Sequence, residues 1–330
     1  MSLRSAEVAA LIADLTRDGE PDWTTIVELG LTGIGVAEEN GGSGGTLVDL
    51  ATAVTELAAR GVQLPLAEIA VARWALQGDP ERLAAPATVA LVETATFAGD
   101  RISATTRGVH GVREATHLVL VVRDRPYASV VNLSGPTVRI EETTDLAGRP
   151  VAAISLNGTD ATPLIVGAET ALARLATLRA AASLGAARGA FALTSTHVRT
   201  RQQFGKPLVA LPSVAMSLAT MRVGLVQAET AVDAALLNPA PAEAAAARLM
   251  TARVATAIAE TAHQLHGAIG ITEEYALHRC TRALWAGRDV DLPESAWARR
   301  LGEHAVSVGE NGIWNDLTAP TAPTEEENAA

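Results

Sequence analysis

The sequence predicts an α+β protein of several domains: a helical N-terminal domain, a small β-barrel domain and a C-terminal domain resembling a four-helix bundle. Amphipathic helical spacing dominates both ends of the chain, whereas short runs rich in Val, Ile, Leu and Thr fill its middle. A chain of 330 residues is long enough for two or three domains. Because helices and strands are grouped and do not alternate, a doubly wound parallel sheet is excluded.

The N-terminal domain, expected over residues 1–84, is helical. Thr46 is a candidate N-cap and Gly61 a candidate helix end. The predicted helices span 3–15, 23–31, 46–61 and 65–76.

The β-domain is expected over residues 85–166, where Gly, Pro and Asp separate short strand-like runs. Its length suits a compact barrel or sandwich. The predicted strands span 87–93, 116–123, 127–132, 137–142 and 151–156.

The C-terminal bundle is expected over residues 167–317, because long amphipathic helices with short connections form bundles. A tail at 318–330, rich in Pro and Glu, is expected to be disordered. The predicted helices span 168–199, 213–237, 242–266, 273–286 and 294–308.

Composition excludes several classes of function. The net charge of -11 and the absence of any Lys/Arg run argue against a nucleic-acid surface. No apolar run reaches membrane-spanning length, and the only cysteine, Cys280, cannot form an intramolecular disulfide. His263 and His266 are three apart, but a zinc site needs three or four ligands, so no metal is expected. These features predict a cytoplasmic protein without nucleic-acid or membrane partners.

The stretch from Arg201 to Pro207, between two long helical runs, combines a guanidinium fork, an aromatic ring, a glycine and a proline. Arg201 can bind a phosphate with two donors at once, and Phe204 can cover a ring beside it. The alternative is an ordinary corner between helices, which Gly and Pro often form.

A second informative stretch runs from Gln264 to Tyr275 and ends a long helix with two glycines, Gly267 and Gly270. Glycines allow a ligand to approach the backbone closely, and the amide of Gln264 is free to bind a ligand edge. Taken alone, this stretch is a helix end followed by a turn.

Together the two stretches resemble the acyl-CoA dehydrogenase family, whose bundle carries Arg-x-x-Phe-Gly-x-Pro and later Gln-x-x-Gly-Gly-x-Gly followed by Glu-Tyr and Arg. The resemblance implies the family's fold, an FAD cofactor, an acyl-CoA substrate and an electron-transfer flavoprotein as acceptor. It implies that five residues contact the pyrophosphate and adenosine side of an FAD held by a neighbouring subunit: Arg201, Phe204, Gln264, Gly267 and Ala268.

The resemblance also implies a carboxylate base that removes the α-proton of the thioester while hydride leaves the β-carbon for the flavin. Counting seventeen residues from Glu274 gives Asp291, whose side chain is one methylene shorter than the family's Glu. The alternatives are that Asp291 caps the helix beginning near Glu294 or is exposed to solvent. A subset of the family carries its base at a position that is here Leu175, which cannot act as one.

A further departure from the family lies in the β-domain, where the Thr-Glu-Pro…Gly-Ser-Asp flavin segment is not found and Val92–Asp100 stands in its place. The cross-subunit residues are retained, whereas those for the chain's own flavin and the chemistry are not. This asymmetry resembles the non-catalytic subunit of heteromeric bacterial members, which often act on bulky, sterol-like acyl-CoA. Three hypotheses remain: a subunit completing the FAD site of a catalytic partner, a self-sufficient homo-oligomer using Asp291, and a helical scaffold without flavin.

Overall fold

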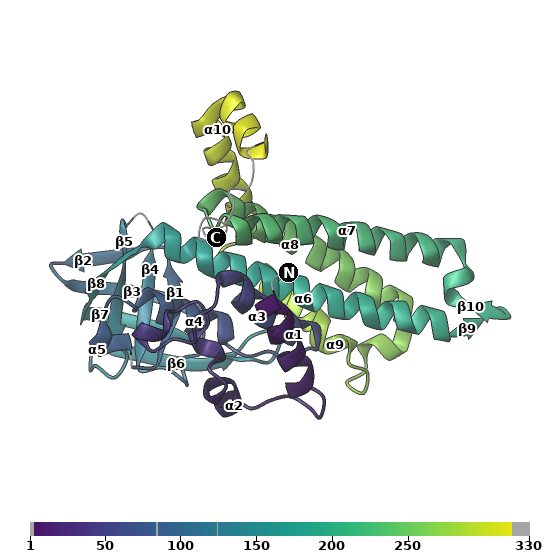
Figure 1. Ribbon diagram of the computed structural model, residues 1–330, viewed down its shortest axis with the longest axis horizontal. Helices are drawn as coiled ribbons and strands as arrows, with labels where there is room; N and C mark the ends of the chain where they lie inside the picture. Colours follow the sequence, from purple (N-terminus) through teal and green to yellow (C-terminus); the bar gives the residue numbers. More distant parts are fainter. Residues whose placement is uncertain (1–2, 84, 124, 319–330) are drawn as a thin grey trace.

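The computed structural model describes residues 3–83, 85–123 and 125–318. It contains the three predicted regions in the predicted order, with the β-domain at one end of an elongated molecule and the tip of the helical bundle at the other (Figure 1). Within the described ranges, every helix is too short or too polar to span a membrane.

The N-terminal region is helical, as predicted. Thr46 caps α3 in a capping box: its hydroxyl accepts from the backbone of Asp49, and the Asp49 carboxylate accepts from the backbone of Thr46. Gly61, with φ of 76°, follows the end of this helix. The elements are α1 (Leu3–Leu15), α2 (Trp23–Glu28), the short 3-10 turns η1 (Leu31–Gly33) and η2 (Glu38–Asn40), α3 (Leu47–Ala59), α4 (Leu66–Ala75) and α5 (Pro80–Leu83).

The β-domain consists of two four-stranded sheets, ordered β1-β4-β5-β8 and β2-β3-β7-β6. Its strands are β1 (Ala87–Val92), β2 (Ala95–Ala98), β3 (Arg101–His110), β4 (His117–Val122), β5 (Tyr127–Asn132), β6 (Val138–Thr144), β7 (Pro150–Asp160) and β8 (Thr162–Gly167). A separate core lies between the sheets, with Leu118 and Leu120 from one and Ile102 and Ile154 from the other fully buried. Strands β2, β3 and β8 were not predicted: β2 is only four residues long, and the buried and exposed positions of β3 and β8 do not alternate regularly.

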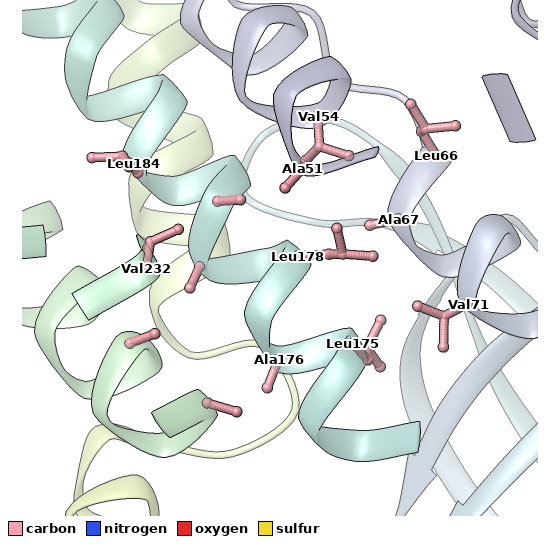
Figure 2. Packing of buried hydrophobic residues seen from close by; sticks show 14 of the residues in the cluster. Ala51, Val54, Leu66, Ala67, Val71, Leu175, Ala176, Leu178, Leu184 and Val232 are labelled. Carbon is pink, nitrogen blue, oxygen red and sulfur yellow. The ribbon is translucent and has the colours of Figure 1, made fainter. Parts of the chain in front are cut away.

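The bundle is organised around one long helix, α6 (Ala168–Thr200), which packs against α3, α7, α8 and α9. Its buried residues Leu175, Leu178 and Leu184 form a continuous core with the N-terminal helices and α7 (Figure 2). The other elements are α7 (Pro212–Leu237), α8 (Pro241–His266), α9 (Leu277–Arg288), α10 (Glu294–Thr318), the strands β9 (Gln202–Gln203) and β10 (Lys206–Pro207), and the 3-10 turns η3 (Leu208–Ala210) and η4 (Gly267–Ile271).

The largest differences from the predicted boundaries in the bundle lie in its last two helices. Helix α9 begins at Leu277 because Thr272 to Tyr275 form a turn. The final helix continues past the predicted end at 308 to Thr318, with a break at Gly309, where φ is 69°. Thr318 therefore belongs to α10, and the rest of the predicted tail, 319–330, lies outside the described residues.

Helices α3 and α6 approach closely because α6 carries glycines at the contact. A Cβ on Gly185 would lie 2.2 Å from the backbone oxygen of Thr55, and one on Gly189 would lie 2.2 Å from that of Ala59. Since backbone atoms cannot yield as a flexible side chain can, the two glycines set the spacing of these helices.

We expect Gly185→Ala to lower the free energy of unfolding by about 1–3 kcal/mol, because the added methyl group overpacks the α3–α6 contact. Gly224→Ala on α7 is the matched control, since its Cβ would lie 3.6 Å from Val254 and meet only ordinary contact. Gly224→Ala should be neutral or stabilise by up to about 1 kcal/mol. Denaturant unfolding measures both; equal effects would contradict the close approach.

Candidate functional site

The corner after α6 is a two-stranded β-hairpin at the tip of the bundle (Figure 1). Arg201 ends α6, with its N–H donating to the carbonyl of His197, and its own carbonyl accepts from Leu208 across the hairpin. The turn residues Phe204 and Gly205 both have positive φ, at 53° and 74°. Two successive positive φ values are typical of the tight turn that matches strand twist.

Phe204 is unusual in this turn. A bulky residue with positive φ is strained, and strained positions persist mainly where function requires them. Phe204 is 84% exposed, so packing within this chain does not offset the cost of the strained backbone. The geometry is therefore that of an aromatic side chain presented to something outside the chain.

The second stretch ends α8 beside this corner. Gln264 is exposed on the last turn, and Gly267 has φ of 64° with no atom within 4 Å of the place a Cβ would take, so the backbone there is open. Ala268 is exposed in η4. Gly270 plays a different part, because a Cβ there would lie 2.7 Å from His266. Gly267 permits close approach of a ligand, whereas Gly270 permits close packing.

Four of the five predicted cofactor residues meet in one cleft of about 620 Å³, which we call the α6–α8 cleft. Its lining residues are His197, Arg201, Leu208, Ser213, Val214, Ser217 and 264–269. Phe204 is not among them and lies on the hairpin that begins after Arg201. Sequence reasoning missed His197, Ser213 and Ser217, because their positions carry no recognisable motif and only the fold brings them to the cleft.

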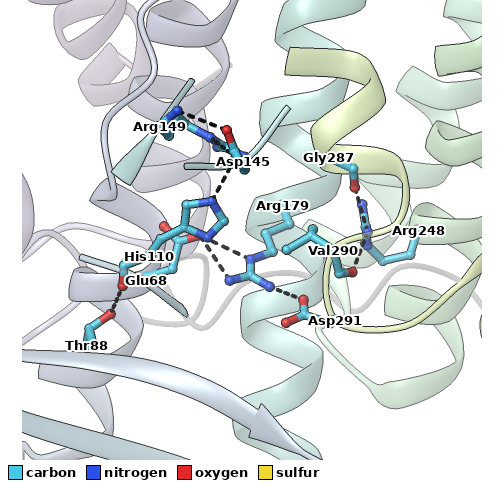
Figure 3. A network of polar contacts seen from close by, with 10 residues as sticks. All are labelled: Glu68, Thr88, His110, Asp145, Arg149, Arg179, Arg248, Gly287, Val290 and Asp291. Atoms are coloured by element: carbon cyan, nitrogen blue, oxygen red, sulfur yellow. Dashed lines mark hydrogen bonds and ion pairs between the residues drawn. The ribbon is translucent and has the colours of Figure 1, made fainter. Parts of the chain in front are cut away.

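Asp291 lies elsewhere, in a buried network between the three regions (Figure 3). Its carboxylate forms an ion pair with Arg179 of α6, and both side chains are only 7% exposed. Arg179 also contacts Glu68 of α4 with both Nε and Nη2 at 3.1 Å. The expectation that Asp291 is exposed or caps the next helix is wrong, because α10 begins at Glu294 and the carboxylate is buried against a guanidinium.

The electrostatics of Glu68 and Arg179 favour their charged forms. Burial alone would lower the pKa of Arg179, but the negative charges of Asp291 and Glu68 outweigh burial and raise it. Burial would raise the pKa of Glu68, yet the positive charges of Arg179, His110 and Arg149 hold it below its usual value.

The network extends into the β-domain through His110, at the end of β3. Its Nε2 lies 3.2 Å from Asp145 Oδ2 and its Nδ1 lies 3.7 Å from Glu68 Oε1. Asp145 also accepts from Nε of Arg149 at 2.7 Å. Burial would raise the pKa of Asp145, but the hydrogen bond to His110 and the charge of Arg149 hold it well below its usual range.

Arg248 of α8, which is fully buried, binds the loop that carries Asp291. Arg248 Nη2 donates to the carbonyls of Gly287 at 2.9 Å and Val290 at 3.2 Å. Burial lowers the pKa of Arg248 to about 10. Asp291 itself has φ of 68°, so this clamp holds a strained backbone.

A second cleft, of about 440 Å³, lies between the β-domain and the Asp291 loop. Glu93, Thr94 and Asp291 are among its lining residues. The stretch after Thr94 forms the hairpin β2–β3, where Ala98 pairs with Arg101 and only two residues make the turn.

Among the described residues, no three of His, Cys, Asp and Glu are grouped to hold a metal ion.

We expect Asp291→Asn to lower the free energy of unfolding by about 3 kcal/mol, because it leaves buried Arg179 with one carboxylate instead of two. Asp289→Asn is the control, since the Asp289 side chain is 52% exposed beside Arg288 and such pairs contribute at most about 1 kcal/mol. Equal unfolding midpoints for the two variants would show that the Arg179–Asp291 pair does not stabilise the fold.

Sequence comparison identifies both helical regions. The sequence model of the acyl-CoA dehydrogenase N-terminal domain matches residues 3–77, and that of the acyl-CoA dehydrogenase C-terminal domain matches residues 166–288. The acyl-CoA dehydrogenase IpdE2 of Mycobacterium tuberculosis is 30% identical over 281 residues, covering 82% of this chain and 81% of that protein. The acyl-CoA dehydrogenase FadE34 of the same organism is 27% identical over 92% of this chain, which spans only 46% of FadE34.

Solved structures share the fold. The ChsE4–ChsE5 complex of Mycobacterium tuberculosis contains a chain with a TM-score of 0.82 at 20% identity, covering 94% of this chain and 99% of that one. The Tcur3481–Tcur3483 steroid ACAD G363A variant gives a TM-score of 0.80 at 23% identity, covering 92% and 97%. With both terminal domains matched and a relative aligned over most of both chains, this chain belongs to the acyl-CoA dehydrogenase family, whose members are FAD-dependent oxidoreductases acting on acyl-CoA.

Proposed function

We propose that this chain is a subunit of a flavin-dependent acyl-CoA dehydrogenase and forms the adenosine diphosphate side of an FAD site completed by a partner chain of the same fold. One observation carries the proposal: Arg201, Gln264, Gly267 and Ala268 line one open cleft, beside a hairpin that exposes Phe204. Since Phe204 is strained and gains no packing within the chain, an external ligand or partner accounts for its conformation.

The donor set of the α6–α8 cleft fits a diphosphate. The guanidinium of Arg201 presents paired donors that match phosphate oxygens. Ser213 and Val214, in the first turn of the 26-residue helix α7, also line the cleft. The unpaired N–H groups and the dipole of a helix N-terminus favour an anion there, and Gly267 leaves room for close approach of the ligand.

The opposite side of the chain is poorly suited to a second, independent reaction centre. Asp291, at the counted position of the base, is neutralised by Arg179. Asp291 and Arg179 also line the 440 Å³ cleft, so it is the ion pair, and not a lack of space, that argues against Asp291 as a base. The residues after Thr94 form the tight β2–β3 hairpin in place of the family's flavin segment. This supports assigning the flavin ring and the base to the partner chain.

The bound FAD would supply a hydride acceptor for α,β-desaturation of the acyl-CoA thioester. This chain's residues would bind and orient the dinucleotide and would leave proton abstraction to the partner. A bulky, ring-bearing acyl group is the substrate class we propose, supported by the steroid enzyme among the structural relatives. An electron-transfer flavoprotein is the acceptor that the family membership suggests.

A self-sufficient homo-oligomer using Asp291 is the second candidate. It is favoured by one observation, that Asp291 lines the 440 Å³ cleft together with Glu93 and Thr94. In that case the ion pair between Arg179 and Asp291 would have to break before the Asp291 carboxylate could accept a proton. A scaffold without flavin is the third, and the open cleft with its retained Arg201 and Gln264 argues against it.

We expect Arg201→Ala to weaken FAD retention in the assembled enzyme about 10- to 100-fold, because hydrogen bonds to charged groups contribute about 1.5–3 kcal/mol. Arg201→Lys should recover only part of the affinity, since the planar fork is lost. Arg199→Ala is the control: this arginine is exposed two residues earlier on α6 and does not line the cleft. Equilibrium dialysis of FAD measures all three, and unchanged retention in Arg201→Ala would mean that the corner is purely structural.

A further inference from the structure

A pair of stacked histidines forms part of the wall of the α6–α8 cleft. His197 lies on the last turn of α6 and His266 on the last turn of α8, with ring centroids 4.4 Å apart and planes inclined by 25°. Both line the cleft together with Arg201 and Gln264. The pair therefore stands where the proposed diphosphate would bind.

The two rings differ in their hydrogen bonds. His266 donates from Nδ1 to the carbonyl of Ala262 at 2.8 Å, and its Nε2 lies 3.3 Å from the hydroxyl of Tyr275, which can donate to it. Both nitrogens of neutral His266 are thus satisfied. For His197, no hydrogen bond joins either ring nitrogen to any residue in the part of the chain that the structure describes. His197 is held in place by stacking and keeps both nitrogens available for a ligand.

The charges around His197 oppose its protonation while the cleft is without an anion. Partial burial lowers its pKa, and the positive charge of Arg201 lowers it further. The other titratable groups facing it are His266 on α8 and Tyr275 before α9; burial lowers the pKa of His266 and raises that of Tyr275. Among the described lining residues, none is Asp or Glu. A diphosphate would supply the negative charge that the cleft lacks.

We propose that His197 is a ligand-binding residue of this site, which takes up a proton as a dinucleotide diphosphate binds and donates a hydrogen bond to a phosphate oxygen. The inference rests on the proposed function and assigns a ligand-binding role to a further residue of the cleft. The proton comes from solvent onto a ring nitrogen, and no covalent bond of the ligand changes. The stack with neutral His266 fixes the plane of the imidazole, so the donor is positioned before the ligand arrives.

The sign of the pH effect follows from this proton uptake. A bound anion raises the pKa of His197 above its value in the free chain. The added affinity is therefore fully present below the free-state pKa and is lost as pH rises through the bound-state pKa. A shift of about one pKa unit corresponds to about a tenfold difference between the affinities of the protonated and neutral forms.

ADP-ribose is the probe of choice, because it carries the adenosine diphosphate without the flavin ring and so reports on this chain's side of the site alone. Calorimetric titration of the purified full chain should give about three- to tenfold tighter binding at about pH 6 than at about pH 8, because binding raises the His197 pKa from a free value below the ordinary histidine pKa of about 6.5. Titrations in buffers of different ionisation enthalpy should show net proton uptake. The same measurements with FAD, made on the complex with the partner chain, test the whole dinucleotide.

Variants separate the inference from the proposed function. His197→Gln should bind ADP-ribose more weakly at about pH 6 and lose the pH dependence. Arg201→Ala should bind more weakly at both pH values, and its affinity should still depend on pH. His117→Gln, in β4 of the β-domain, is the matched control and should behave as wild type. Should His197→Gln fold poorly, histidine NMR of the wild-type chain decides instead: addition of ADP-ribose should raise the pKa of one cleft histidine.

The outcomes are distinct. If Arg201→Ala weakens binding but His197→Gln keeps the wild-type pH dependence, or if no histidine pKa rises with ADP-ribose, the role of His197 is overturned and the proposed function stands. If ADP-ribose fails to bind the chain and FAD fails to bind the complex with the partner chain, or if Arg201→Ala has no effect, both proposals fall.

Discussion

The ion pairs of one buried guanidinium hold the three regions of this molecule together. Arg179, in the middle of α6, contacts Glu68 of the N-terminal helices and Asp291 of the loop before α10, while Glu68 faces His110 of the β-domain (Figure 3). Burying these charges is costly, and the cost is offset only because each has an opposite charge beside it. Removing Asp291 or Glu68 would leave Arg179 with one carboxylate instead of two, so the network favours one arrangement of the regions.

Two positions along α6 differ in their electrostatic surroundings. Around Arg179, in the middle of the helix, the positive charge is balanced within the chain by two carboxylates. At the C-terminal end of the helix, Arg201 and His197 face an open cleft whose described lining residues include no carboxylate. The positive charge at the C-terminal end is therefore left for an anionic ligand, whereas that of Arg179 already has its partners. This asymmetry is the physical basis for assigning the chain a supporting part in a shared flavin site.

Sequence reasoning predicted the fold and the position of most helices, because amphipathic spacing and caps such as Thr46 are local signals. It missed β2, which is only four residues long, and β3 and β8, which pair with strands distant in the sequence. It placed Arg201 and Gln264 together through two separated motifs, and the fold brings both to one cleft. The partners of Asp291 could not be predicted, since Arg179 lies 112 positions earlier and only the packing of α6 brings it there. His197 was missed for a similar reason, because its significance depends on stacking with His266 from another helix.

The central claim is that this chain supplies one side of a flavin site and a partner chain supplies the other. The most direct test is the ratio of FAD to protein, measured from flavin absorbance, for the chain purified alone and for the complex obtained by co-expression with a dehydrogenase-like partner. The account predicts little FAD in the chain alone and about one FAD per pair of chains in the complex. A homo-oligomer of this chain that carries one FAD per chain would contradict it.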